Sequence, residues 1–455
     1  MESFFIHNAH IVNEGKHFPG SVYLHAGRIA EVFIGKKPDS FRLPPETVII
    51  DAREKLLMPG VIDDHVHFRD PGLTEKGDLY TESRAAVAGG VTSFMDMPNT
   101  LPKAVTLEIL ENKYTLAADK SLANFSFFLG ASSDNLDEIR KADPSRICGL
   151  KLFAGASTGN MLVSNPASLE AIFRESPLII AVHSEDEGVI QANLKIFREE
   201  YGEDIPIWCH PLIRSEEACY KSSEQMVSLA RKYNSRLHLL HLSTVRELDL
   251  LDNSIPLEKK KISGEVCVHH LWFDDRDYAE LGSRIKWNPA IKSEKDKTGL
   301  MEGLISDKID IVATDHAPHL LIEKENPYTS CPSGAPMIQH SLVAMLGFTH
   351  LGRLSVEKVI QKMCHSPALL YRVCERGFIR KGFHADLVLV DMDAPWTVTR
   401  ENILYKCGWS PMEGVTFRSR VCMTWVNGNL VFDHGRFDET VKGQRLSFNP
   451  AANNN

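Results

Sequence analysis

The sequence predicts an α/β fold, a (β/α)8 TIM-type barrel with a small β-sandwich domain built from both chain ends. Eight apolar runs of β type alternate with helical segments along the middle of the chain. Both ends instead alternate apolar and polar residues between Gly, Asn and Pro. Unusual polar residues end several central runs, and barrels build their active sites at that edge. A doubly wound sheet is the alternative, because a sequence does not reveal strand order.

The small β domain is predicted to comprise residues 1–57 and 385–455. Its strand candidates at the amino end are HNAHIVNEG, SVYLHAGRIAEVFIG and TVIIDAREKLLMPG. The same alternation of apolar and polar residues recurs near the carboxyl end, in HADLVLVDMDAPWTV and SRVCMTWVNGNLVFDHG. The pair Asn427-Gly428 lies between two alternating runs and is a strong hairpin signal. The two ends could therefore pair into one domain.

The barrel is predicted to occupy residues 58–384. Its strand candidates, in order, are LMPGVIDDHVHF, VTSFMDMP, ANFSFFLGA, ICGLKLFA, PLIIAVHSE, RLHLLHLST, KISGEVCVHH and IDIVATDHAP. Each is followed by a plausible helix or by a gap of helix size. LYTESRAAVAGG follows the first run, and SEEACYKSSEQMVSLARKYN precedes the sixth. Nearly continuous apolar runs are typical of parallel strands that are buried on both faces.

Composition narrows the range of functions. The net charge of −9 and the pI near 6.1 give no basic excess that would favour nucleic acid or an anionic membrane. A small anionic substrate would then need a local positive site. The nine cysteines are scattered and form no Cys-x-x-Cys motif, so we expect reduced thiols and a cytoplasmic protein. We expect no signal peptide and no membrane span.

His65 and His67 end the first barrel run. Residues two apart on a strand point to the same side, so both could face one metal ion. Imidazole suits zinc, and a catalytic zinc site keeps a position open for water. Taken alone, His-x-His is weak evidence, because two polar residues on a half-exposed strand are at least as common. His183, after the apolar run IIAV, could be a ligand or an ordinary core histidine.

Three further residues extend the candidate metal site. His241 lies nearer the end of its run than His238, which would face the opposite side, so we favour His241. Asp315 is a carboxylate after an apolar run and needs a cationic partner. Lys151 would repel a metal unless its amine is neutral and carries carbon dioxide as a carbamate, which could bridge two cations. A salt-bridging lysine is the alternative.

Arg69 lies two residues beyond His67 and so points to the same side as the candidate metal. A guanidinium there is justified if the substrate brings a carboxylate, which Arg binds in a bidentate manner. The alternative is a surface ion pair with Asp70 or a neighbour. Asn99 in DMPNT and His319 in DHAPH lie at the same edge. They could equally be a turn residue and a loop histidine.

These residues, with the motifs HVHFRDPG, MDMPNT, GLKLF and TDHAPH, resemble the amidohydrolase superfamily and, within it, the dihydroorotase family. The resemblance covers nearly the whole chain. It implies two Zn²⁺ per chain, bridged by carboxylated Lys151 and a hydroxide. One ion would be held by His65, His67 and Asp315, and the other by His183 and His241.

The resemblance also implies a reaction and a substrate site. The reaction is the reversible hydrolysis of the cyclic amide of dihydroorotate to N-carbamoyl-aspartate, a step of pyrimidine biosynthesis, with Asp315 as base and then acid. Arg69, Asn99 and His319 would grip the substrate carboxylate. Asn288, in KWNPAI, would contact the pyrimidine ring. The partner is thus a small molecule, and a homo-oligomer is left open.

Some features depart from the pattern. Many bacterial dihydroorotases have aspartate where this chain has Lys151, and relatives usually have proline where it has Val268. Allantoinase or another cyclic-amide hydrolase therefore stays an alternative. A catalytically silent homologue is less favoured, because all six protein ligands are present.

Residues 319–337 are long enough to form a lid over the site, although an ordinary surface loop fits as well.

Overall fold

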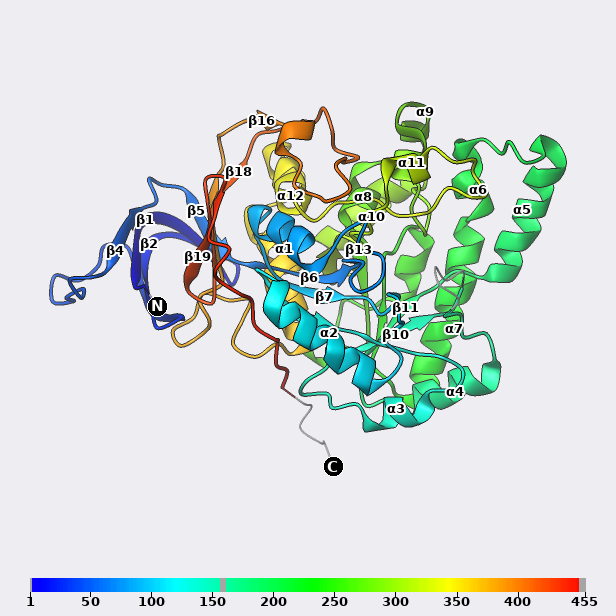
Figure 1. The fold of residues 1–455 in the computed structure, drawn as a ribbon, viewed down its shortest axis with the longest axis horizontal. Coiled ribbons are helices and arrows are strands. Elements are labelled where there is room, and N and C mark those ends of the chain that lie inside the picture. Colours follow the sequence, from blue (N-terminus) through cyan, green and yellow to red (C-terminus); the bar gives the residue numbers. More distant parts are fainter. Residues whose placement is uncertain (1, 156–160, 450–455) are drawn as a thin grey trace.

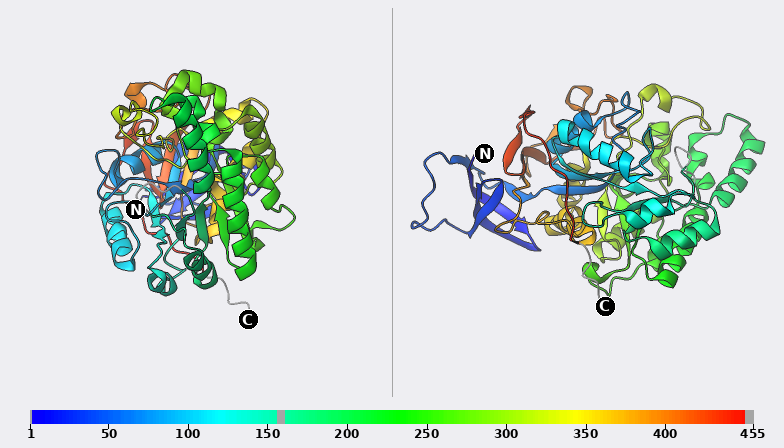
Figure 2. Two further views of the ribbon diagram at one scale, coloured as in Figure 1. Left: turned by 90° about the vertical axis from the view of Figure 1, so that its right-hand side faces the viewer. Right: turned by 60° about the horizontal axis from the view of Figure 1, so that its bottom comes forward.

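The structure is a computed structural model that describes residues 2–155 and 161–449. A barrel of strands and helices forms the larger part of the molecule, and a curved β sheet stands at one end of it (Figure 1). The right-hand view in Figure 2 shows the same arrangement, with the amino-terminal strands projecting from the barrel. The predicted fold class is confirmed.

The barrel strands are parallel and follow the chain order. Two runs of pairing, β6-β7-β8 and β9 through β14, make up the wall, and β8 and β9 are separated only by Phe128. A parallel bridge between Val66 and His316 joins the last strand to the first. Each predicted barrel run contains a strand. The bounds are β6 (Val61–Val66), β7 (Val91–Asp96), β8 (Asn124–Phe127), β9 (Leu129–Gly130), β10 (Leu150–Phe153), β11 (Ile180–His183), β12 (Leu237–Leu239), β13 (Ile262–Cys267) and β14 (Ile311–Ala313).

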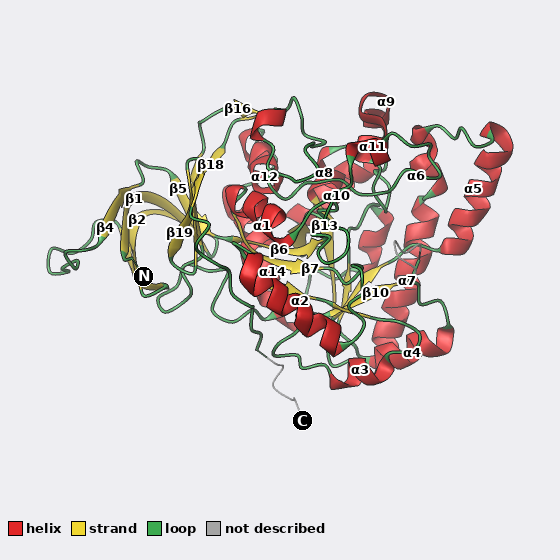
Figure 3. Cartoon of the chain, in the orientation of Figure 1, coloured by secondary structure: helices red, strands yellow, loops and turns green. Residues whose placement is uncertain are grey.

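Helices surround these strands, as the red segments of Figure 3 show. Their bounds are α1 (Leu79–Ala88), α2 (Leu107–Lys120), α3 (Leu136–Lys141), α4 (Pro166–Glu175), α5 (Glu187–Tyr201), α6 (His210–Ile213), α7 (Glu216–Tyr233), α8 (Val268–Trp272), α9 (Tyr278–Leu281), α10 (Glu294–Ile305), α11 (Leu321–Lys324), α12 (Ser341–His350), α13 (Val356–Ile360) and α14 (Ser366–Tyr371). Short 3-10 or π turns are η1 (Ile207–Cys209), η2 (Arg246–Leu250), η3 (Leu257–Lys259), η4 (Asp275–Asp277), η5 (Gly282–Ile285), η6 (Gln361–His365) and η7 (Arg400–Asn402). Among the described residues, no helix is both long and apolar enough to cross a membrane.

Local sequence explains where the two predicted helices begin and end. The Asp78 carboxylate accepts hydrogen bonds from the backbone of Tyr80 and Thr81 and so caps the start of α1. The helix ends before Gly90, whose φ of 85° is readily adopted only by glycine. Ser215 caps α7 in the same way, and Asn234 ends it in the left-handed conformation.

Strands from both chain ends share one sheet of nine strands. Its order is β20-β19-β18-β15-β5-β1-β2-β3, and β4 pairs with β1. Asn427 and Gly428 both have positive φ and form the turn between β18 and β19, as the hairpin signal predicts. The exact domain limits stay a prediction. The bounds are β1 (Phe4–Asn13), β2 (Lys16–His25), β3 (Arg28–Ile34), β4 (Val48–Asp51), β5 (Leu56–Pro59), β15 (Leu387–Asp391), β18 (Arg420–Val426), β19 (Asn429–Asp433) and β20 (Arg436–Phe437), with a separate hairpin of β16 (Trp396–Thr397) and β17 (Thr416–Phe417).

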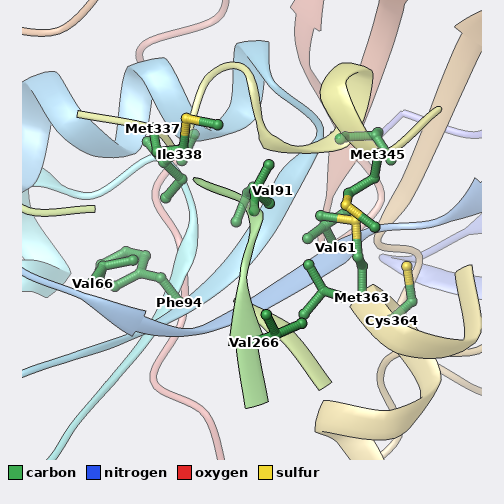
Figure 4. Packing of buried hydrophobic residues seen from close by; sticks show 14 of the residues in the cluster. Val61, Val66, Val91, Phe94, Val266, Met337, Ile338, Met345, Met363 and Cys364 are labelled. Carbon is green, nitrogen blue, oxygen red and sulfur yellow. The ribbon is translucent and has the colours of Figure 1, made fainter. Parts of the chain in front are cut away.

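The core holds the strand ends in place. Val61 and Val66 of β6 and Phe94 of β7 belong to a fully buried cluster with Met345 and Met363 from later helical segments (Figure 4). Burying an aliphatic or aromatic side chain of this size contributes about 1.5–3 kcal/mol relative to exposure. The first two barrel strands therefore pack against helical segments from later in the chain. This packing gives rigid support to the polar residues at the ends of these strands.

Candidate metal centre and active site

A small cavity opens at the carboxyl ends of the barrel strands. Eight of the ten predicted site residues line it, although they come from sequence positions up to 250 residues apart. The other two, Asn99 and His319, contact residues of the lining. The lining residues are His65, His67, Arg69, Lys151, Phe153, His183, His241, Trp287, Asn288, Asp315, Ala317, Ser333 and Gly334.

His65, His67 and Asp315 form one group of donors. The Oδ1 atom of Asp315 lies 3.3 Å from Nε2 of His65 and 3.1 Å from Nε2 of His67. The δ nitrogens of both rings face other oxygen atoms, 2.6 Å away on Glu265 and 2.8 Å away on Asn99. A carboxylate can only accept, so Nδ1 of His65 carries the proton and a neutral ring keeps its Nε2 lone pair. This group fits a metal ion.

His183 and His241 are in direct contact in the lining of the cavity. Nδ1 of His183 lies 2.9 Å from Nε2 of His241. Burial lowers the pKa of both imidazoles, which favours the neutral form that binds metals. Within the described part of the chain, Nδ1 of His241 has no hydrogen-bond partner. The ring centroid of His241 lies 5.3 Å from the ring centroid of His65. The second group of donors therefore lies directly beside the first.

Lys151 is buried and lines the same cavity. Burial lowers the pKa of its amine to about 8. Its Nζ lies 4.7 Å from the centre of the Phe153 ring, and no hydrogen bond or ion pair to it exists among residues 2–155 and 161–449. The salt-bridging alternative therefore finds no support in these residues. An amine that loses its proton easily is able to react with carbon dioxide.

Three of the predicted site residues, which follow the ends of their strands, have a strained backbone conformation. Arg69, His241 and Asp315 have φ values of 68°, 40° and 44°. Each such residue costs about 1–3 kcal/mol, and strain of this kind clusters at functional sites. Buried Asp63 supports the conformation near Asp315, because its carboxylate accepts hydrogen bonds from the hydroxyl and the backbone N–H of Thr314. Asp63 is thus a supporting residue inside the barrel.

Arg69 is buried and lines the cavity. Its Nη2 lies 3.1 Å from Nε2 of His319, and its Nε donates to the carbonyl of Pro318. Asp70 pairs instead with Lys120 at 2.8 Å, and no carboxylate pairs with Arg69 in the described residues. Burial, followed by the charge of Arg69, lowers the pKa of His319 to about 3. The ion-pair alternative for Arg69 is therefore not realised.

The predicted lid segment packs against the barrel. The buried amine of Lys324 donates to the backbone carbonyls of Lys286, Pro332 and Gly334. The carbonyl of Ser333 lies 3.1 Å from Nε2 of His319. Ser333 and Gly334 line the cavity, and movement of the segment stays a prediction.

Two carboxylates behind the ligands were not predicted. Glu265 contacts His65, and Glu185 lies 3.1 Å from Nε2 of His183 while it pairs with Arg214. Both are fully buried. The signal for Glu265 was a charged residue inside the apolar run ISGEVCV, and that for Glu185 was its place two residues after a candidate ligand. His269 stacks on Trp287 with ring centroids 4.0 Å apart.

Comparison with known proteins assigns the chain to a family. The sequence pattern of the amidohydrolase family matches residues 56–431, so the chain belongs to the amidohydrolase family. Its curated relatives include the dihydroorotase of Pyrococcus abyssi, which is 32% identical over 432 residues that cover 93% of this chain and 96% of the relative. The dihydroorotase of Methanosarcina acetivorans is 30% identical, with coverage of 91% and 89%.

Solved structures show the same fold. The L-hydantoinase (dihydropyrimidinase) from Arthrobacter aurescens matches with a TM-score of 0.90 and 27% identity, over 96% of this chain and 97% of the other. The dihydropyrimidinase from Brevibacillus agri NCHU1002 has a TM-score of 0.86 at 21% identity, over 98% and 99% of the two chains. The predicted barrel with its β-sandwich domain is thus confirmed.

Proposed function

We propose that this protein is a zinc-dependent dihydroorotase, which reversibly hydrolyses the cyclic amide of dihydroorotate to N-carbamoyl-aspartate in pyrimidine biosynthesis. The observation that carries the proposal is the buried guanidinium of Arg69, which has no carboxylate partner among the described residues and lies beside a metal donor set. A charge in that position is costly unless a ligand brings the opposite charge. The dihydroorotase relatives support the same substrate.

Two zinc ions fit the donors. His65, His67 and Asp315 would hold one, His183 and His241 the other, and carboxylated Lys151 would bridge them. When bound, such a pair polarises a carbonyl and makes water nucleophilic near neutral pH. The lowered pKa of Lys151 and its lack of a polar partner in the described residues support the carbamate.

The substrate would be oriented by the chain's own residues. Arg69 would bind the carboxylate through two hydrogen bonds, with His319 beside it and Asn99 next to His67. Asn288 lines the cavity, and its Oδ1 is buried without a partner in the described residues, so it could accept a hydrogen bond from a ring N–H. Asp315 would take the proton from the attacking water and pass it to the leaving ring nitrogen.

The test is hydrolysis of dihydroorotate by zinc-loaded protein, side by side with allantoin, dihydrouracil and hydantoin. We expect consumption of dihydroorotate to exceed that of the three rings that lack a carboxylate. If an uncharged ring is preferred, the protein is another cyclic-amide hydrolase and the role of Arg69 is wrong. If no ring is consumed although zinc is bound, the silent-homologue alternative holds.

We also propose a cytoplasmic location, which the nine free cysteines support. Cell fractionation followed by detection of the tagged protein tests this point. Light scattering of the purified protein decides whether it forms a homo-oligomer.

A further inference from the structure

Glu265 occupies an unusual place behind the candidate metal centre. It is the fourth residue of β13, it is fully buried, and it lies between β12 and β14. A buried carboxylate is unfavourable unless its oxygens are hydrogen bonded. Here both oxygens have partners, and apart from the thiol of Cys267 these lie on or just after two other strands, β6 and β12.

One oxygen of Glu265 joins the two donor groups. Its Oε1 lies 2.6 Å from Nδ1 of His65 and accepts a hydrogen bond of 3.1 Å from the backbone N–H of His241. His65 belongs to the first group and His241 to the second. The same atom thus orients the ring of one candidate ligand and the main chain of another.

The second oxygen anchors the carboxylate itself. Its Oε2 lies 3.2 Å from Nε2 of His238, and Nδ1 of His238 lies 2.8 Å from the hydroxyl of Ser263. His238 is therefore a support for Glu265 and not a part of the cavity lining. The backbone of His241 also needs an anchor, because its φ of 40° is unfavourable for a residue with a side chain.

We propose that Glu265 is a positioning residue that sets the orientation of His65 and His241 together and so couples the two metal positions. This proposal rests on the proposed metal-dependent function. Carboxylates that accept from the far nitrogen of a ligating histidine fix its tautomer and raise its basicity. Glu265 would also accept a hydrogen bond from the backbone of His241, the candidate ligand that follows the neighbouring strand.

The test compares metal binding by the wild type, Glu265→Gln and Glu265→Asp. Glutamine keeps the size and an acceptor oxygen but removes the charge. Aspartate keeps the charge, but it is one methylene shorter and cannot reach both partners. We expect both variants to bind Zn²⁺ about 10–100-fold more weakly. The visible spectrum of the Co²⁺-loaded protein should also change, since it reports the arrangement of the ligands.

Glu247→Gln is the matched control. Glu247 is a buried carboxylate near the same barrel edge, bonded to Ser223 and Thr244 and to no candidate ligand. We expect this variant to bind metal like the wild type. Equal losses in Glu247→Gln and Glu265→Gln would overturn the proposal, because the effect would then be general to buried carboxylates. Wild-type metal affinity and cobalt spectrum in a folded Glu265→Gln or Glu265→Asp protein would overturn it as well.

The outcome is separable from the proposed function. If the wild type binds metal but does not hydrolyse dihydroorotate, the substrate assignment fails and the metal-binding comparison still decides the role of Glu265. If the wild type is active and the variants keep its metal affinity, the proposed function stands and the positioning role is wrong.

Discussion

Arg69, which lines the cavity, is in contact with His319, and Nη2 of the arginine lies 3.1 Å from Nε2 of the histidine. The nearest acidic residue in sequence, Asp70, pairs with Lys120 instead. The guanidinium is therefore held in position by neutral partners, and its charge is left for a ligand.

Replacing Arg69 by methionine should weaken recognition of a substrate carboxylate. Hydrogen bonds to charged groups contribute about 1.5–3 kcal/mol, so kcat/KM for dihydroorotate should fall about 10–150-fold, mainly through KM. Hydrolysis of dihydrouracil, which lacks the carboxylate, should not fall. Lys232→Met, which removes an exposed cation paired with Glu170, is the control. An unchanged KM for dihydroorotate in Arg69→Met would refute the clamp.

Asp315→Asn should separate proton transfer from metal binding. We expect turnover to drop about 10²–10⁴-fold, because an amide cannot accept the proton, while part of the metal is retained. Steady-state rates and metal content by mass spectrometry measure the two effects. Asp310→Asn, which changes a carboxylate paired with Lys260 just before β14, should keep turnover. Wild-type turnover in Asp315→Asn would show that another group moves the proton.

Removal of metal by a chelator should abolish activity, and added Zn²⁺ should restore it.

Protein prepared in ¹³C-labelled bicarbonate should show a carbamate signal by NMR. Lys151→Arg should lack that signal and should bind fewer metal ions, because a guanidinium does not form the carbamate. A wild-type metal content in Lys151→Arg would contradict the bridging role.

Acid should destabilise the protein through buried His340. Burial lowers the pKa of its imidazole in the folded state to about 3, whereas the unfolded value is about 6.5. Between these values the unfolded chain binds a proton that the folded chain does not, so stability falls as pH drops below about 6.5. The contribution reaches about 1.4 kcal/mol per pH unit.

His340→Asn should remove about one proton from this dependence, since the amide oxygen can still accept from Tyr405 or Ser410. Urea unfolding followed by circular dichroism from pH 4.5 to 7 measures the slope. The exposed His25→Asn variant is the control. An unchanged slope in His340→Asn would mean that other buried histidines carry the acid sensitivity.

The buried pair of Lys113 and Asp96 should matter for stability. Its atoms lie 2.7 Å apart, and Asp96 also accepts from the backbone of Phe68, the residue between His67 and Arg69. Lys113→Met should cost about 3–5 kcal/mol, because it leaves a buried carboxylate without its cation. Lys232→Met, which breaks the exposed pair with Glu170, should cost less than about 1 kcal/mol. Equal losses in urea unfolding would contradict this reasoning.

The site could be predicted from the sequence where a polar residue interrupts or ends an apolar run. His183 and Asp315 stand out in this way, and the two-residue spacing of His65 and His67 puts both on one side of a strand. The function of Glu265 could not be predicted, because its partner His65 is 200 residues away. Asn99 illustrates the same limit, since its contact with His67 depends on the distance between two strand ends.

The sequence by itself determined the alternation of strands and helices, the hairpin at Asn427-Gly428 and the kinds of side chain available as ligands. Apolar periodicity and turn preference are local properties, so they can be read along the chain. Only the tertiary structure decided that Arg69 lacks a carboxylate partner among the described residues, that Lys151 is buried beside the histidines and that Glu265 links two ligand groups. These properties depend on which strand ends meet when the barrel closes, and on how much water the packed core excludes from them.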